Sequence, residues 1–293
     1  MGTPRFCGAP IMCASIPEKR NVRTMAANED RKAPDATAHR PTLRVIDALE
    51  TLSRHPEGCT LTVLSQAIDV SPSTLLPILK TLASRHFIAV DPLTGAYTIG
   101  IRAFSVGSAF VENESIVSEL RSEMEDVVAL CQETCQLGVL DGGDVFYIAK
   151  VDSSQAIRLI SSIGRRVPAY CTALGKALLS DYDDEKIHSL FKEPFARYTN
   201  KTLTSADELC RAIREQAVEG IFREDEESRE SVVCYSVPLR QHGAIVAATS
   251  ISVPKFRLSE EKESLVIGAL RSYQERASKI LESYPDCDGL LLG

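Results

Sequence analysis

Residues 75–99, LLPILKTLASRHFIAVDPLTGAYTI, decide the fold of the N-terminal part of the chain. The second half of this stretch has apolar residues on both sides of residues 91–95, Asp-Pro-Leu-Thr-Gly, and this composition is typical of a turn between two strands. The first half has the i, i+3, i+4, i+7 spacing of one apolar helix face, at Leu75, Ile78, Leu79 and Leu82. The stretch therefore predicts a helix followed directly by a β-hairpin.

Two further helices are predicted before this stretch. Apolar residues recur at helical spacing over 43–52, and Thr60 is a suitable N-cap for a helix over 61–68. Only a few residues separate that helix from the next one. A tight turn between the last two helices and a hairpin directly after them are typical of a winged helix-turn-helix, which we expect over residues 41–100.

The remainder of the chain predicts an α+β domain over residues 115–284, joined to the first domain by a linker helix over 101–114. The turn Asp141-Gly142-Gly143-Asp144 indicates an antiparallel hairpin. A long helical pattern over 116–135 precedes it and is expected to carry Cys131 and Cys135 on one face. The other expected elements are strands over 136–140, 145–151, 157–163, 231–239 and 244–253, and helices over 172–180, 183–190, 205–219 and 259–283.

Composition excludes several classes of protein. The chain has 293 residues, of which 44% are hydrophobic and 25% charged, and these values are ordinary for a globular protein with two domains. No apolar stretch is long enough to span a membrane, and the nine scattered cysteines favour reduced thiols and a cytoplasmic location. No metal site or cofactor is expected. Residues 1–40 are predicted to be a disordered arm, and residues 285–293 a tail.

The sequence resembles the IclR family of bacterial transcription regulators from Thr42 to Ser283. The resemblance implies a GAF-like effector-binding domain behind the winged helix-turn-helix, dimers or tetramers as the assembled state, and transcription controlled by a small metabolite. The residues that carry the resemblance are LASRHFIAVD at 82–91 with YTIG at 97–100, LDGGDV at 140–145, GRRVP at 164–168 with TALGKA at 172–177, and Gly220, Asp225, Glu226, Glu227 and Cys234.

Double-stranded DNA is the first expected partner, in the form of a near-palindromic operator. The N-terminal part of a recognition helix meets base edges and phosphates in the major groove, and hydroxyls and cations suit those contacts. A capping role for each hydroxyl, and a solvated surface for each cation, remain equally open. The candidate DNA-binding residues are Arg40, Arg44, Ser71, Ser73, Thr74, Leu76, Lys80 and Arg85.

One position departs from the family pattern. Relatives usually carry a polar and then a basic residue in the recognition helix where this chain has Leu76 and Pro77. Because proline lacks an N–H and disfavours helical geometry in the preceding residue, we expect the helix to begin late, with Thr74 as its N-cap, or to be kinked near Pro77. DNA binding is then weaker, differently specific or, in the extreme case, lost.

The second expected partner is a small effector that carries a carboxylate. Thr172 is a suitable N-cap for a helix whose first amides form an anion site, and the resemblance places Ala173 and Leu174 at the main-chain donors. It also aligns Cys234 with a pocket cysteine and Glu224 with an acidic pocket residue, whose neighbour is Asp225. Ser250 and Ser252 alternate onto one strand face. The expected apolar wall consists of Leu159, Val167 and Val232.

Each of these features also has a purely structural explanation. For Cys234 alone a buried structural thiol is the commoner explanation, and the resemblance places the pocket above it. The segment at Thr172 is also explained as an ordinary capped helix, and residues 223–230 as a solvated acidic loop rather than a metal loop. An enzyme that uses Cys234 as a nucleophile would need a base, and no triad motif accompanies the histidines of the large domain. A further alternative is an effector-sensing module that has lost DNA binding and acts through a protein partner. The identity of the effector is left open.

Overall fold

The computed structural model describes residues 38–113 and 115–284. The chain divides into two compact units, of which one ends at Ser108 and the other begins at Ala109. All but the last three residues of the predicted arm, and the whole predicted tail, lie outside the described residues. Within the described residues, no helix is long and apolar enough to cross a membrane.

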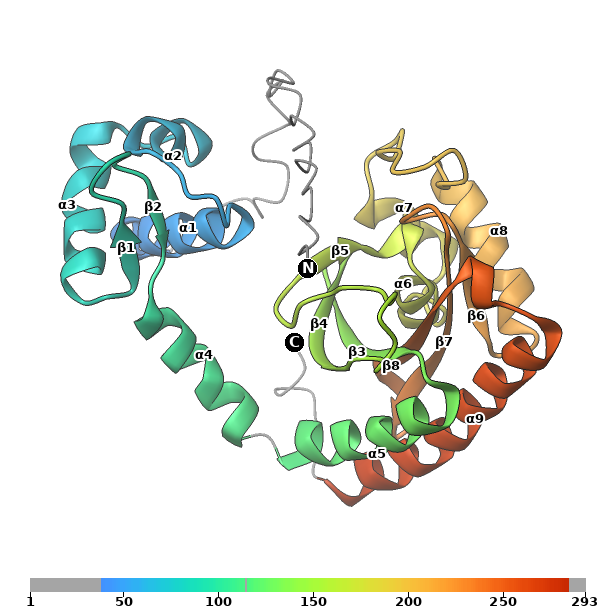
Figure 1. Ribbon diagram of the computed structural model, residues 1–293. Coiled ribbons are helices and arrows are strands. Elements are labelled where there is room, and N and C mark those ends of the chain that lie inside the picture. Colours follow the sequence, from blue (N-terminus) through green and yellow to red (C-terminus); the bar gives the residue numbers. More distant parts are fainter. Residues whose placement is uncertain (1–37, 114, 285–293) are drawn as a thin grey trace, which may run out of the picture. The chain divides into compact units, whose positions relative to one another are not determined.

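The first unit contains three helices and a two-stranded hairpin, followed by the greater part of a fourth helix that the division at Ser108 cuts (Figure 1). Thr60 caps the second helix as expected, because its hydroxyl accepts a hydrogen bond from the Val63 amide. Leu52, Leu64 and Leu75 are buried together between the helices. The elements are α1 (Arg40–Arg54), α2 (Leu61–Ala67), α3 (Pro72–Ser84), β1 (Ile88–Val90) and β2 (Tyr97–Ile99).

Helix α3 does not begin late, and this expectation was wrong. Its N-cap is Ser71, whose hydroxyl accepts from the Thr74 amide, and Pro72 occupies the first helical position, where its fixed φ favours a helix start. The helix then continues unbroken through Pro77 to Ser84. Proline removes only the hydrogen bond to the Ser73 carbonyl, and both residues are exposed, so water can replace the missing donor.

The second unit is built on an antiparallel sheet of six strands in the order β5-β4-β3-β8-β7-β6. The sheet brings β3 beside β8, although more than 100 residues separate them, with Gln136 paired to Ser250. The strands are β3 (Thr134–Asp141), β4 (Asp144–Val151), β5 (Arg166–Pro168), β6 (Phe222–Asp225), β7 (Val232–Gln241) and β8 (Ala244–Pro254). Helix α4 (Ile101–Asn113), at the predicted linker, spans the division between the two units. The helices of the second unit are α5 (Ser115–Cys131), α6 (Ala173–Leu178), α7 (Asp184–Leu190), α8 (Ala206–Ala217) and α9 (Glu260–Ser283), with short 3-10 turns η1 (Ala169–Cys171) and η2 (Lys255–Arg257).

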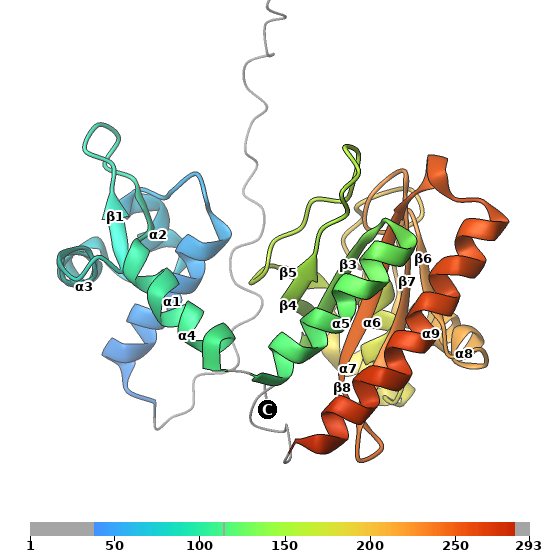
Figure 2. The ribbon, with the colours of Figure 1, turned by 60° about the horizontal axis from the view of Figure 1, so that its bottom comes forward.

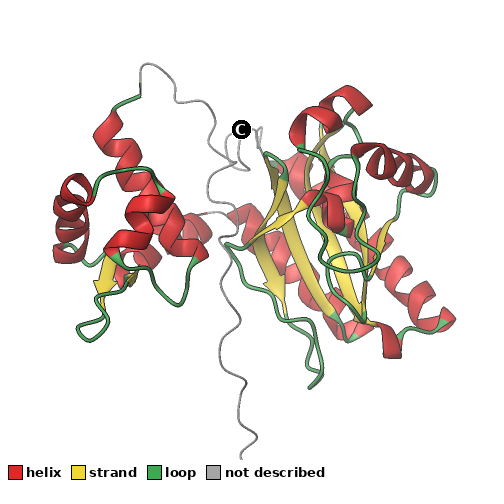
Figure 3. Ribbon diagram, turned by 90° about the horizontal axis from the view of Figure 1, so that it is seen from above, coloured by secondary structure: helices red, strands yellow, loops and turns green. Residues whose placement is uncertain are grey.

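Helices cover both faces of this sheet (Figures 2 and 3). Helices α5 and α9 lie side by side on one face, where Met124, Tyr273 and Tyr235 belong to one buried apolar cluster. Helices α6, α7 and α8 lie on the opposite face, called the inner face below, around Leu174 and Leu209. Each strand alternates between the two faces, so adjacent residues of β6, β7 and β8 have different surroundings.

Three local expectations about this unit were wrong. Residues 157–163 form a loop instead of a strand, and Ile157 and Ile160 are exposed. Cys131 and Cys135 do not share a helix face, because Gln132 has a left-handed φ of 55° that ends α5, and Cys135 belongs to β3. Residues 223–225, the start of the acidic loop expected over 223–230, belong to strand β6.

Candidate functional site

The exposed face of α3 is the first candidate site. Leu75 and Leu79 are completely buried against the rest of the first unit. The exposed residues of the helix recur at spacings of three and four on the opposite side, and they form a continuous stripe. We call this set the α3 stripe: Ser73, Pro77, Lys80, Thr81 and Ser84.

The hydroxyls at the start of α3 bond to one another. Ser71 Oγ lies 3.0 Å from Ser73 Oγ and 2.9 Å from Thr74 Oγ1, while it also caps the helix. These three contacts match the one proton and two lone pairs of the Ser71 hydroxyl, so Ser71 would have to release a neighbouring hydroxyl to contact DNA.

The other DNA-binding candidates occupy different positions. Leu76 is half-buried beside the stripe, Lys80 is on it, and Arg85 is the C-cap residue of α3. Among the described residues, neither Lys80 nor Arg85 has a carboxylate partner. Arg40 and Arg44 lie on α1 instead, at its first residue and one turn later.

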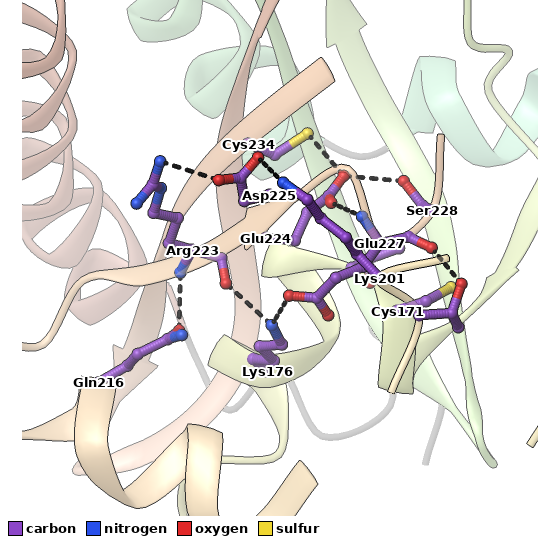
Figure 4. Close-up of polar contacts among 12 residues, drawn as sticks. Cys171, Lys176, Lys201, Gln216, Arg223, Glu224, Asp225, Glu227, Ser228 and Cys234 are labelled. Carbon is purple, nitrogen blue, oxygen red and sulfur yellow. Dashed lines mark hydrogen bonds and ion pairs between the residues drawn. The ribbon is translucent and has the colours of Figure 1, made fainter. Parts of the chain in front are cut away.

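The second candidate site is a row of polar side chains on the inner face of the sheet. Glu224 on β6 pairs with Cys234 on β7, and Cys234 pairs with Ser252 on β8. Cys234 Sγ lies 3.5 Å from Glu224 Oε1 and 3.3 Å from Ser252 Oγ. Three side chains from three neighbouring strands thus converge on one point (Figure 4 shows the first two).

Gln136 extends this row to β3. Its Oε1 accepts hydrogen bonds from Ser250 at 3.3 Å and from Ser252 at 2.9 Å. Its Nε2 donates to Ser161 Oγ at 3.0 Å, in the loop between β4 and β5. All four of these side chains are buried. We call the group Gln136, Glu224, Cys234, Ser250 and Ser252 the inner-face cluster.

Glu224 is the titratable centre of the cluster. Its carboxylate accepts from the Glu227 amide at 2.7 Å and from Ser228 Oγ at 2.8 Å, while only 1% of the residue is exposed. Burial raises the pKa of Glu224 to about 7, and the two hydrogen bonds only partly oppose this rise. Burial, and next the nearby Glu224 carboxylate, also raises the pKa of the Cys234 thiol, so Cys234 is not an activated nucleophile.

A buried ion pair lies beside the cluster. Lys176 on α6 donates to Glu227 Oε1 at 2.5 Å and to the Arg223 carbonyl at 2.9 Å, with only 1% of its side chain exposed. Burial raises the pKa of Glu227. Glu227 Oε2 is buried and has no hydrogen-bond partner among the described residues. The site therefore holds an unused carboxyl oxygen next to Glu224.

Helix α6 begins close to these carboxyl groups. Thr172 caps it as expected, accepting from the Gly175 amide at 3.0 Å. Among the described residues, the amides of Ala173 and Leu174 have no acceptor, although both residues are buried. The helix packs against β6, the strand that carries Glu224. Burial, and next the Glu224 carboxylate, raises the pKa of Cys171, the residue before Thr172.

The remaining effector candidates are not all at the cluster. Val232 lies on the same face of β7 as Cys234, two residues away. Val167 lies on the edge strand β5, packed against the inner-face core, and Leu159 is half-buried in the loop between β4 and β5. Asp225 faces away from Glu224 and bonds to Lys201 at 3.2 Å and to Lys255 at 3.0 Å.

Two family models match most of the chain. Residues 41–92 match the IclR helix-turn-helix domain, and residues 108–279 match the bacterial transcriptional regulator IclR C-terminal domain. The chain belongs to the IclR family. The winged helix-turn-helix is therefore a DNA-binding domain, and the α+β unit is the domain through which IclR regulators respond to effectors.

Named relatives of this IclR-family chain are transcription regulators. KdgR of Escherichia coli K12 is 31% identical over 255 residues, which cover 86% of this chain and 96% of KdgR. A putative regulator from Rhodococcus sp. RHA1 has a solved structure with a TM-score of 0.70 and 26% identity, covering 84% of this chain and 99% of that one. The relatives give no support to the enzyme alternative.

An IclR homologue from Microbacterium hydrocarbonoxydans has the same fold at 19% identity, with a TM-score of 0.68 that covers 83% of this chain and all of that one. Its crystal structure is a complex with 4-hydroxybenzoate.

Sequence reasoning missed several residues of the IclR-family effector domain. Gln136 and Lys176 are buried polar residues, and Glu227 and Ser228 hold Glu224 through the turn after β6. Alternation could have placed Gln136 on the face of β3 opposite Cys135 and Leu137. No local signal marks Lys176, because its burial depends on the packing of α6 against β6 and β7.

Proposed function

We propose that this protein binds a near-palindromic operator through α3 as a dimer or tetramer, and that a small carboxylate-bearing metabolite bound at the inner-face cluster controls the binding. The observation that carries the effector part is a set of buried polar groups without partners. These are the amides of Ala173 and Leu174, at the start of the helix that packs against β6, and Glu227 Oε2, whose residue bonds to Glu224 through its own amide. Buried polar groups normally have hydrogen-bond partners, so a ligand that forms hydrogen bonds with these groups stabilises the site.

The electrostatics of the site favour an acid with at least one further polar group. Two free amides at a helix start donate to an anion. Glu224, whose pKa is about 7, is half protonated at neutral pH and can donate a hydrogen bond instead of repelling the ligand. The bound 4-hydroxybenzoate in the Microbacterium homologue is also a carboxylate with a hydroxyl, which supports the same class of ligand here.

The net charge of the winged helix-turn-helix, called the head below, supports DNA binding by more than one copy of the chain. Between Arg40 and Gly100, five Lys and Arg residues face five Asp and Glu residues, so one head attracts DNA weakly. Two heads on a symmetric site double the number of phosphate contacts. Within one head, the cations available for these contacts are Arg40, Arg44, Lys80 and Arg85.

Pro77 favours one alternative, a sensor that has lost DNA binding and acts through a protein partner. It occupies the middle of the α3 stripe, where a guanidinium would make a strong guanine or phosphate contact. Lys80 and Arg85 remain on or beside the stripe, and for this reason we place DNA binding first.

Selection from randomised duplex DNA at two salt concentrations tests the operator part. We expect enrichment of a near-palindromic sequence whose affinity falls steeply with salt. A chain that begins at Met25 is compared in parallel, to measure the contribution of the first 24 residues. Failure to enrich any sequence would favour the alternative.

Thermal shift with matched acids and amides tests the effector part. Keto acids, hydroxy acids and aromatic acids are each compared with the corresponding amide. We expect an acid, but not its amide, to raise the melting temperature of the protein. Cys234→Ser should lower the affinity for that acid and so reduce the rise. Cys210→Ser, at a buried thiol on α8, is the control and should change stability without changing the choice of ligand.

A further inference from the structure

We infer that Pro77 is a specificity-determining residue that contacts the 5-methyl group of a thymine in the major groove. The inference rests on the proposed function, because it requires α3 to enter DNA. Pro77 is the sixth residue of α3 and lies at the centre of the α3 stripe, one turn from Ser73 and one turn from Thr81. Its ring is exposed on the side of the helix opposite Leu75 and Leu79.

The surface around this ring has few free polar groups. Pro77 has no N–H, and its carbonyl accepts from Thr81 Oγ1 at 2.9 Å. Ser84 Oγ in turn donates to the Thr81 carbonyl at 2.8 Å. The two hydroxyls nearest the C-terminal side of the ring are therefore directed to the helix backbone. The half-buried Leu76 extends the apolar surface beside it.

Major-groove chemistry limits what such a surface can recognise. Guanine, cytosine and adenine present only hydrogen-bonding groups there, whereas thymine also presents a methyl group. A proline ring cannot donate or accept a hydrogen bond, so it leaves the polar edges of the other bases unpaired when it covers them. Contact with a thymine methyl buries apolar surface on both partners, and this favours thymine at the base pair under Pro77.

Uracil substitution tests this contact in the full-length protein. A duplex enriched by selection is made with each thymine replaced in turn by uracil, which lacks only the methyl group. Affinity is measured by fluorescence anisotropy at fixed salt. We expect replacement of one thymine in each half-site to lower the affinity for the duplex about fourfold, which is the value for one buried methyl group. Replacement of the other thymines should change the affinity little.

Two variants separate this contact from general DNA affinity. Pro77→Ala removes most of the apolar surface of the ring and keeps the helix, so the difference in affinity between thymine and uracil at the sensitive position should shrink well below fourfold. Lys80→Ala removes a cation from the same stripe; it should weaken binding to all duplexes and keep the fourfold difference. A flat uracil scan with the wild-type protein, or an unchanged difference in Pro77→Ala, overturns the inference and leaves the proposed function intact. Failure to bind any duplex overturns both.

Discussion

Glu224 makes the stability of the effector domain depend on pH. Its pKa is about 7 in the folded protein, above its ordinary value of 4.5 because the carboxyl is buried. Folding therefore favours the protonated form. This stabilisation is complete below about pH 4.5 and is lost as the pH rises towards 7. Between pH 5.5 and pH 8 we expect Glu224 to lower the free energy of unfolding by about 2 kcal/mol.

Urea unfolding followed by circular dichroism at these two pH values measures this effect. Glu224→Gln cannot ionise, so the free energy of unfolding of this variant should fall about 2 kcal/mol less than that of the wild type over the same interval. Glu230→Gln, at an exposed position six residues later, is the control, and its free energy of unfolding should fall by as much as that of the wild type. Equal pH dependence in all three proteins would show that Glu224 ionises in the folded state as easily as in water.

At the scale of single elements, close packing of α6 holds the start of this helix in place. A side chain at Gly175 would overlap the carbonyl and Cα of Ala169, and neither backbone atom can move aside without moving η1. Gly175→Ala should therefore lower the free energy of unfolding by about 3 kcal/mol. Gly268→Ala is the matched control on α9, where a Cβ meets no atom within 4 Å, and helix propensity should make it stabilising by about 0.5–1 kcal/mol. Denaturant titration of both variants tests the difference, and a mild effect of Gly175→Ala would mean that α6 can shift.

The turn η2, between β8 and α9, carries a more strongly buried ion pair than most in this domain. Arg257 donates to both oxygens of Glu133, at 2.8 and 2.7 Å, and only 1% of the Glu133 side chain is exposed. Arg257→Met leaves this carboxylate with Lys262 alone, at 3.3 Å, and should destabilise by about 3 kcal/mol. Arg240 makes a similar two-pronged contact with Asp181, but both side chains are about 40% exposed, so Arg240→Met should cost less than about 1 kcal/mol. Similar losses of stability in urea for the two variants would contradict the inference that burial makes the ion pair of Arg257 the stronger of the two.

The elements that could be predicted from the sequence are those with local signals. The caps at Thr60 and Thr172 and the glycine turn before β4 form contacts within a few residues, and the structure contains all of them. Strand β6 was missed because its burial depends on pairing with β7, which follows an intervening turn. Residues 157–163 have the isoleucine spacing expected of a strand, yet no strand among the described residues pairs with them.

The same distinction applies to the candidate site. Alternation along β8 predicted the common face of Ser250 and Ser252, and both bond to Gln136. The neighbours Glu224 and Asp225 were assigned to one site, whereas a strand sends them to opposite faces. Lys176 and Glu227 form their ion pair across 51 residues of chain, and no short-range pattern predicts such a contact.

At the scale of the whole molecule, effector control must link two units that each have their own core. If effector binding changes operator affinity by some factor, operator binding must change effector affinity by the same factor, because both describe one coupling free energy. We expect a factor of about 5–150, the usual range for allosteric proteins. Calorimetric titration of the effector into protein alone, and into protein saturated with operator duplex, gives one side of this cycle. Operator titrations with and without effector give the other side, and a duplex with a scrambled operator should leave effector affinity unchanged. Unequal factors on the two sides would mean that the effector also changes the assembly state of the protein, so that the coupling does not pass within one chain alone.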